Sequence, residues 1–130
     1  MSEADLDAVR EFIRAFNVQD LDRFVSVLDD EVELHTMALG LIHGPDAARG
    51  WATKRPGGVQ QTLELEELQQ NGDQVVALMR QVWRWAEEEE GGEPAEIKEV
   101  AALFTVVDGK ITRWEPFAER TGALAAAGIA

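Results

Sequence analysis

The sequence predicts an α+β fold in which helices come first and antiparallel strands follow. Two helix-like stretches, each with one apolar face, occupy residues 4–28, and a third begins at Gly44. From Val59 onward, long strand-like stretches are separated by Asn71-Gly72 and Asp108-Gly109, which are strong hairpin signals. This order is typical of a sheet with its helices gathered on one face. Because the strand candidates are long, we expect a strongly curved, mostly antiparallel sheet with three N-terminal helices over its concave face.

Composition restricts the class of protein. The chain has 130 residues, 45% of them hydrophobic, which suits a single domain (1–130) with a continuous core. Its formal net charge of −13 makes nucleic acid and anionic membrane surfaces poor partners. Cysteine is absent, which excludes disulfides, thiolate nucleophiles and zinc–cysteine sites. The acidic start is unlike a signal peptide, and no apolar run approaches the ~20 residues that span a bilayer, so we expect a cytoplasmic protein.

The N-terminal elements follow from helical spacing and from capping residues. Asp20 is expected to cap the second helix, and "EVELHTM" (31–37) alternates as a strand does. Gly44-Pro45-Asp46 suits the start of the third helix, which should run to about Trp51 or Lys54. The apolar faces consist of Leu6, Val9, Phe12, Ile13 and Phe16 in the first helix, and of Leu21, Phe24, Val25 and Leu28 in the second.

The C-terminal half is predicted to consist of strands and one short helix. An acidic loop at 88–94 separates two of the strands. Val100 to Val107 is nearly all apolar, as expected of a central strand that is buried on both faces. The tail, 119–130, is weakly helical and should pack on the outside. The strand candidates are 60–68, 74–87, 96–107 and 110–117.

Three stretches resemble the nuclear transport factor 2-like superfamily: "VREFIRAFNVQDLDRFVSVLDDEVELH", "IHGPDAARGW" and "LFTVVDGKITRWEPF". Within it, the sequence is most similar to the SnoaL-like polyketide cyclases and the ketosteroid isomerases, and the likeness covers essentially the whole chain. The resemblance implies a cone-shaped, cystatin-like sheet or α+β barrel with a pocket between helices and sheet. One such scaffold hosts isomerases, cyclases, dehydratases, epoxide hydrolases and non-enzymes, so the likeness specifies fold more narrowly than activity.

Compared position by position, the chain has a basic residue type where the isomerases place their aspartate base, but it lacks their oxyanion hole. The tyrosine of the isomerases corresponds to Phe12, and their central-strand aspartic acid corresponds to Ala102. Their general base corresponds to His35. The arginine of limonene epoxide hydrolases corresponds to Arg80, but Val82 stands in place of the first of its two aspartates. The resemblance therefore disfavours epoxide hydrolysis and leaves His35 as the candidate base.

His35 and Arg80 are the predicted catalytic residues. A neutral imidazole can take a proton next to a carbonyl, and an arginine can stabilise the resulting oxyanion. Alternation puts His35 on the strand face opposite Leu34, so the strand would have to bend or end there for the imidazole to reach the pocket. The isomerase alignment points Leu78, Arg80 and Val82 toward the pocket. The alternative is that Arg80 forms a cross-strand ion pair on an outer or dimer face.

The predicted substrate site is an apolar wall, although core packing would equally explain its members. No cofactor and no metal are expected, because two histidines without a cysteine cluster or a helical i,i+4 pair do not make a metal site. His43 is interpreted as ordering the turn before the third helix. The substrate-binding candidates are Phe12, Phe16, Leu78, Phe104 and Trp114, with Leu34 beside them and Trp51 closing the mouth.

Met79, Trp83 and Trp85 share the strand face opposite Arg80. Large apolar groups on an outer sheet face indicate a partner surface, and the resemblance implies sheet-to-sheet pairing, so a homodimer is predicted. Three functions remain open. The first is a cofactor-independent isomerase, cyclase or dehydratase acting on a hydrophobic carbonyl compound. The second is a non-catalytic protein that binds a hydrophobic ligand, and the third is a dimeric accessory domain with a filled core.

Overall fold

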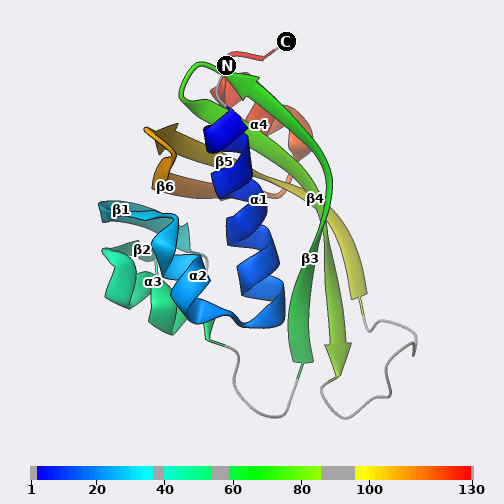
Figure 1. The fold of residues 1–130 in the computed structure, drawn as a ribbon. Helices are drawn as coiled ribbons and strands as arrows, with labels where there is room; N and C mark the ends of the chain where they lie inside the picture. Colours follow the sequence, from blue (N-terminus) through cyan, green and yellow to red (C-terminus); the bar gives the residue numbers. More distant parts are fainter. Residues whose placement is uncertain (1–2, 37–39, 54–58, 86–95, 130) are drawn as a thin grey trace.

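The computed structural model describes residues 3–36, 40–53, 59–85 and 96–129, with the backbone alone at 59, 60, 84 and 85. Helices pack on a mixed, mostly antiparallel sheet, which confirms the α+β class (Figure 1). Closure of the sheet into a cone stays a prediction, and the acidic loop at 88–94 lies outside the described residues. The helices are α1 (Glu3–Val18), α2 (Leu21–Ser26), α3 (Pro45–Ala52) and α4 (Arg120–Ala126). The strands are β1 (Leu28–Thr36), β2 (Gly40–His43), β3 (Val59–Asn71), β4 (Gln74–Trp85), β5 (Glu96–Val107) and β6 (Lys110–Phe117).

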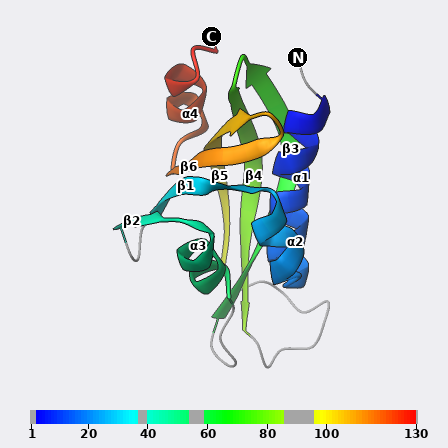
Figure 2. The ribbon, with the colours of Figure 1, turned by 60° about the vertical axis from the view of Figure 1, so that its left-hand side comes forward.

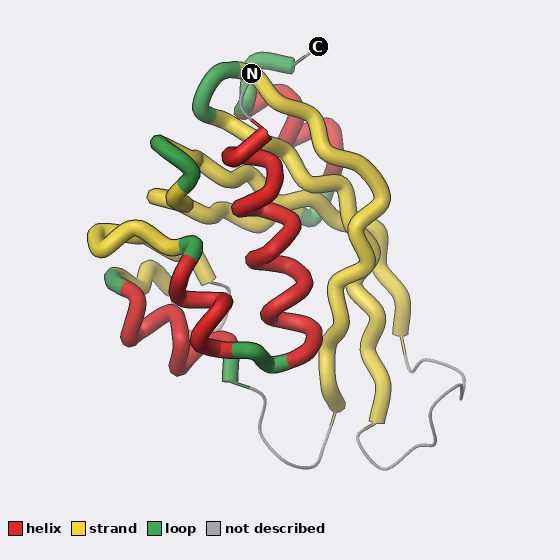
Figure 3. The backbone as a smooth tube through the Cα atoms, viewed as in Figure 1, coloured by secondary structure: helices red, strands yellow, loops and turns green. Residues whose placement is uncertain are grey.

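The helices form where their capping residues predict them, and Figure 3 shows α1 with the shorter α2 and α3 beside it. The Asp20 side chain accepts a hydrogen bond from the Arg23 amide at 3.3 Å and so caps α2. Pro45 lies in the first turn of α3, where its missing N–H costs nothing. The predicted second helix is too long at its end, because Leu28 begins β1 instead.

Within the described residues, the strands form one six-stranded sheet in the order β2-β1-β6-β5-β4-β3. β1 runs parallel to β6, and the other neighbours are antiparallel. The β5–β6 turn is Asp108-Gly109, as predicted, and both residues have the positive φ that such hairpins require. The β3–β4 turn lies one residue later than predicted, at Gly72-Asp73. The edge strand β2 was not predicted.

The two faces of the sheet are covered by different helices, and Figure 2 shows the sheet between α1 and α4. One face, here called the helix face, packs against α1, α2 and α3 through the larger hydrophobic cluster. The opposite outer face packs against α4 through a smaller cluster that includes Val76, Leu78, Ala101 and Leu103. Residues 101–104 are buried throughout, which confirms β5 as a central strand buried on both faces.

Side chains at both ends of α1 bind the sheet. At its start, the buried Asp5 carboxylate accepts a hydrogen bond from the Gly109 amide of the β5–β6 turn at 3.1 Å. Near its end, the Asn17 amide group donates to the Leu63 carbonyl at 2.7 Å and accepts from the Leu63 amide at 2.9 Å. Asn17 thereby pairs with the open side of edge strand β3, as a further strand would. The face of α1 that carries Phe12 and Phe16 is thus held against the sheet.

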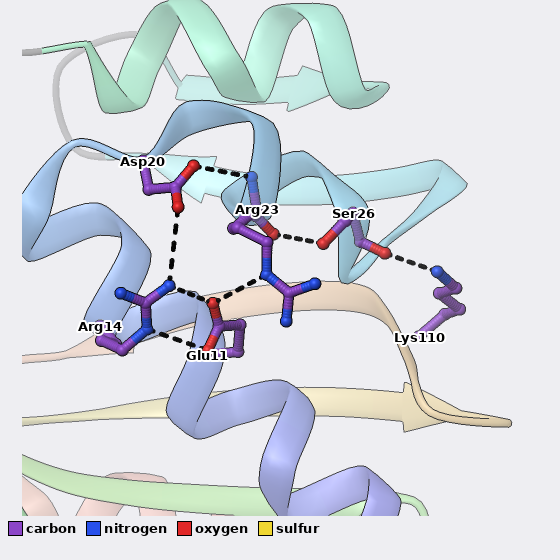
Figure 4. Close-up of polar contacts among 6 residues, drawn as sticks. All are labelled: Glu11, Arg14, Asp20, Arg23, Ser26 and Lys110. Carbon is purple, nitrogen blue, oxygen red and sulfur yellow. Dashed lines mark hydrogen bonds and ion pairs between the residues drawn. The ribbon is translucent and has the colours of Figure 1, made fainter.

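An ion-pair network joins α1 to α2 (Figure 4). The Glu11 carboxylate accepts hydrogen bonds from the guanidinium groups of Arg14, at 2.5 Å, and Arg23, at 3.2 Å. These contacts lower the pKa of Glu11 from 4.5 to about 2; the hydrogen bond from Arg14 is the largest cause, and partial burial opposes it. Arg49 of α3 continues the connection by binding Asp22 of α2 at 2.9 Å.

Replacing Glu11 by glutamine should make the free energy of unfolding less dependent on pH in the acidic range. Because the folded pKa of Glu11 is depressed, its stabilising contribution is complete above pH 4.5 and is lost as the pH falls toward 2. Both arginines are half exposed, so we expect a loss of only about 1 kcal/mol at pH 6 and almost none at pH 2.5. Urea unfolding at the two pH values measures this difference. Asp7→Asn, which breaks an exposed pair with Arg10, is the control and should change little at either pH.

Candidate functional site

A cluster of six aromatic rings lies between the helices and the helix face of the sheet. Phe12, at its centre, is fully buried, with ring centroids 4.7 Å from Phe24, 5.0 Å from Phe104 and 6.4 Å from Trp114. The helical i,i+4 spacing puts Phe16 on the same face of α1. We call this set the aromatic cluster; it consists of Phe12, Phe16, Phe24, Trp51, Phe104 and Trp114.

Trp51 extends the aromatic cluster from the core toward the surface. It lies on α3 and is only partly buried. Its ring centroid is 5.7 Å from that of Phe16 and 4.9 Å from that of Trp114. Trp51 thus lies at the outer end of the cluster, and its role at a pocket mouth stays a prediction.

Trp114 contributes a polar atom that the sequence interpretation overlooked. It lies on β6 directly beside Leu34 of β1 and Phe104 of β5, and its side chain faces the helices. The residue is 7% exposed, and its indole Nε1 has no hydrogen-bond partner among the residues that the structure describes. Leaving a buried donor unpaired costs about 1–3 kcal/mol. The residue type alone could have drawn attention to this donor, because a buried tryptophan N–H normally requires an acceptor.

Phe12 and Ala102, at the two positions where the isomerases carry oxyanion-hole donors, both belong to the larger cluster on the helix face. Neither side chain can donate a hydrogen bond. The Trp114 ring stacks near Phe12, so its N–H is a donor in the neighbourhood from which those two are missing.

His35 lies outside the aromatic cluster. Val32 and Leu34 of β1 are fully buried in the larger cluster, and His35 lies on the opposite strand face with Glu33. Its Nε2 is 4.0 Å from the Glu33 carboxylate, which is too long for a hydrogen bond, and the side chain is about one-third exposed. Burial alternates without interruption from Val32 to Thr36, so the position of His35 does not support a base at the cluster. Its catalytic role stays a prediction.

His43 and His35 are not a pair. His43 ends β2, just before the Gly44 that precedes α3, and its exposed Nε2 is 3.4 Å from Glu31. This position agrees with the interpretation of His43 as a residue of the turn. Within the described ranges, no three His, Asp or Glu side chains are arranged to hold a metal ion.

Arg80 forms the cross-strand ion pair that was the alternative interpretation. It is the direct partner of Glu64 in the β3–β4 ladder, and the two side chains are 2.5 Å apart and each 43% exposed. The hydrogen bond that the Arg80 guanidinium donates to the Glu64 carboxylate raises the pKa of Arg80. Leu78, on the same strand face, packs in the smaller cluster against α4. The predicted pocket-facing orientation is therefore wrong for Leu78 and, by alternation, for Arg80 and Val82. Their roles at a site stay untested.

The surface predicted for a homodimer is not formed as expected. Met79 is 2% exposed and lies in the larger cluster, so it faces the helices rather than a partner. Alternation along β4 puts Trp83 on the same face as Met79, and the side chain of Trp85 is outside the description. The physical reason is that residues 75–79 of β4 are apolar on both faces, since α4 covers the outer one. A homodimer itself stays a prediction.

Solved structures show the same fold at low sequence identity. The protein named "putative polyketide cyclase" from Xanthomonas campestris pv. campestris is 21% identical, with a TM-score of 0.73, covering 95% of this chain and 96% of that one. An LEH-like epoxide hydrolase from M. tuberculosis is 19% identical, with a TM-score of 0.71 and coverage of 95% and 91%. A cystatin-fold protein from Novosphingobium aromaticivorans is 23% identical, with a TM-score of 0.66 and coverage of 89% and 99%.

Curated proteins yielded no match to the sequence. Across the described part of the chain, no helix is both long and apolar enough to cross a membrane. The model of the SnoaL-like domain matches residues 9–114, a span that begins within α1 and reaches Trp114 on β6. Because this match covers most of the chain, it shows that the chain belongs to the SnoaL-like family.

Proposed function

We propose that this protein binds a hydrophobic small molecule at the aromatic cluster, between α1, α3 and the helix face of the sheet. The observation that supports this most is that the cluster extends from the fully buried Phe12 to the partly buried Trp51. A ligand would enter at this outer end, beside Trp51, and contact the rings behind it. Large, rigid aromatic side chains are well suited to this because they offer contact area at low entropic cost.

Binding should be measurable with small bicyclic compounds. Titrations of 1-tetralone, followed by tryptophan fluorescence and by thermal shift, should saturate and raise the melting temperature. Trp51→Ala should weaken binding about ten-fold, since an aromatic contact contributes about 1.4 kcal/mol. Leu41→Ala is the matched control, because it removes an apolar side chain that is 60% exposed on β2. Equal affinities of all three proteins would place the ligand elsewhere.

A second candidate function is cofactor-independent isomerisation, cyclisation or dehydration of a hydrophobic carbonyl compound. It is favoured by the family and by neighbours whose names include polyketide cyclase and ketosteroid isomerase. In that case His35 would remove a proton and Arg80 would stabilise the oxyanion. Because both lie away from the aromatic cluster, we place this candidate after ligand binding.

The two candidates differ in what happens to the bound compound. Ligands that bind should be incubated with the protein and followed by product analysis. We expect them to be recovered unchanged. Turnover that falls by more than about a hundred-fold in His35→Ala would instead support the catalytic function, since general bases contribute about 10²–10⁴-fold.

A further inference from the structure

The indole N–H of Trp114 is a buried donor that the described residues leave unpaired. The residue is 7% exposed, and Nε1 is without a partner among the described residues. An indole nitrogen donates one hydrogen bond and accepts none. Its surroundings are apolar: the Trp51 ring centroid is 4.9 Å away, that of Phe12 is 6.4 Å away, and Leu34 lies beside it on β1.

We propose that this N–H binds a neutral oxygen acceptor of the ligand, so that the ligand class is an apolar compound with a ketone, ester or ether oxygen at its buried end. This inference rests on the proposed function, because it needs a ligand at the aromatic cluster. The oxygen would satisfy Nε1, while the carbon skeleton would contact the rings of Phe12 and Trp51.

A charged acceptor is disfavoured by the same surroundings. A carboxylate taken out of water requires a cation or several donors, whereas Trp114 offers a single neutral one. Arg80 and Arg113 are already paired, with Glu64 and Glu115. The chain also carries a formal net charge of −13, which repels anions.

An alcohol fits less well than a ketone or an ether. Its oxygen could accept from Nε1, but its own hydroxyl hydrogen would then need an acceptor inside an apolar cluster. The remaining possibility is that Nε1–H rests on the face of a neighbouring ring, a weak contact that would leave no role for a ligand oxygen.

The test uses two compounds that differ in one carbonyl group, 1-tetralone and tetralin. Both should bind the wild-type protein, and the ketone should bind about three- to ten-fold more tightly, as one added hydrogen bond implies. In ¹⁵N-labelled protein, 1-tetralone should shift the indole N–H resonance of Trp114 downfield, whereas tetralin should not. The resonance can be assigned in the wild type from contacts to the Phe12 ring, so this measurement needs no variant.

Trp114→Phe keeps an aromatic ring and removes the N–H. We expect it to abolish the preference for the ketone, so that the ratio of the affinities for 1-tetralone and tetralin falls from about three- to ten-fold to about one. Trp51→Phe, which removes the neighbouring indole N–H, is the matched control and should retain the preference for the ketone.

The outcomes separate the inference from the function on which it rests. If neither compound binds the wild type, ligand binding at the cluster is wrong and the inference falls with it. If both bind equally and the Trp114 resonance does not shift with the ketone, binding stands and the inference is overturned. Tighter binding of 1,2,3,4-tetrahydro-1-naphthoate than of 1-tetralone would also overturn it, because the acceptor would then be an anion.

Discussion

Phe12→Ala is expected to lower the free energy of unfolding by about 3–5 kcal/mol, the largest effect of any single substitution proposed for this protein. Phe12 has no exposed surface, and its ring contacts those of Phe24, Phe104 and Trp114. These rings come from α2, β5 and β6, so the cavity left by alanine would adjoin three separate elements. Urea unfolding followed by tryptophan fluorescence measures the loss.

The matched control is Val18→Ala, on the same helix but 61% exposed, which should change stability by no more than about 0.5 kcal/mol. If Phe12→Ala cost no more than Val18→Ala, the ring of Phe12 would not be packed at the centre of the aromatic cluster.

Asn17→Leu is expected to cost about 2 kcal/mol, although leucine is close to asparagine in size. The substitution leaves both the amide and the carbonyl of Leu63 without the partners that Asn17 provides. These groups are on edge strand β3 and are partly buried beneath α1, so water can replace the lost bonds only in part. Amide hydrogen exchange should also accelerate at Leu63.

Asn17→Asp removes one of the two hydrogen bonds to Leu63 and keeps the other. The carboxylate can still accept from the Leu63 amide, but it cannot donate to the Leu63 carbonyl. We therefore expect a loss of stability similar to or greater than that of Asn17→Leu, but a smaller acceleration of exchange at the Leu63 amide. Unchanged exchange in both variants would show that Asn17 does not hold the edge of the sheet.

Much of the fold follows from local patterns. Apolar spacing predicts α1, Asp20 predicts the start of α2, and Asp108-Gly109 predicts the β5–β6 turn. The parallel pairing of β1 with β6 was not predicted, because it depends on contacts between segments that are distant in the chain. The edge strand β2 was missed for a similar reason: its four residues form a strand only because β1 pairs with them.

Which face of a strand packs against the helices could be predicted only where the other face is polar. β1 alternates strictly from Val32 to Thr36, so the placement of His35 opposite Leu34 follows from the sequence. Residues 75–79 of β4 are apolar on both faces, because α4 covers the outer one, and alternation alone does not say which face meets α1. Leu78 and Met79 were therefore assigned to the wrong faces.

Most rings of the candidate site were predicted from the sequence, but the unpaired hydrogen-bond donor among them was not. Five of the six rings, Phe24 excepted, were proposed as wall or mouth residues, and the structure brings them together. Whether the Trp114 N–H finds an acceptor depends on the tertiary neighbours of one atom, which no periodicity encodes.

The central claim is that a hydrophobic ligand occupies the aromatic cluster, and intermolecular nuclear Overhauser effects with bound 1-tetralone test it most directly. We predict effects from the ligand to the ring protons of Phe12, Trp51 and Trp114, on the helix face of the sheet. Effects confined to outer-face residues such as Leu78 and Ile97, or none at all under conditions where the compound is bound, would contradict the claim.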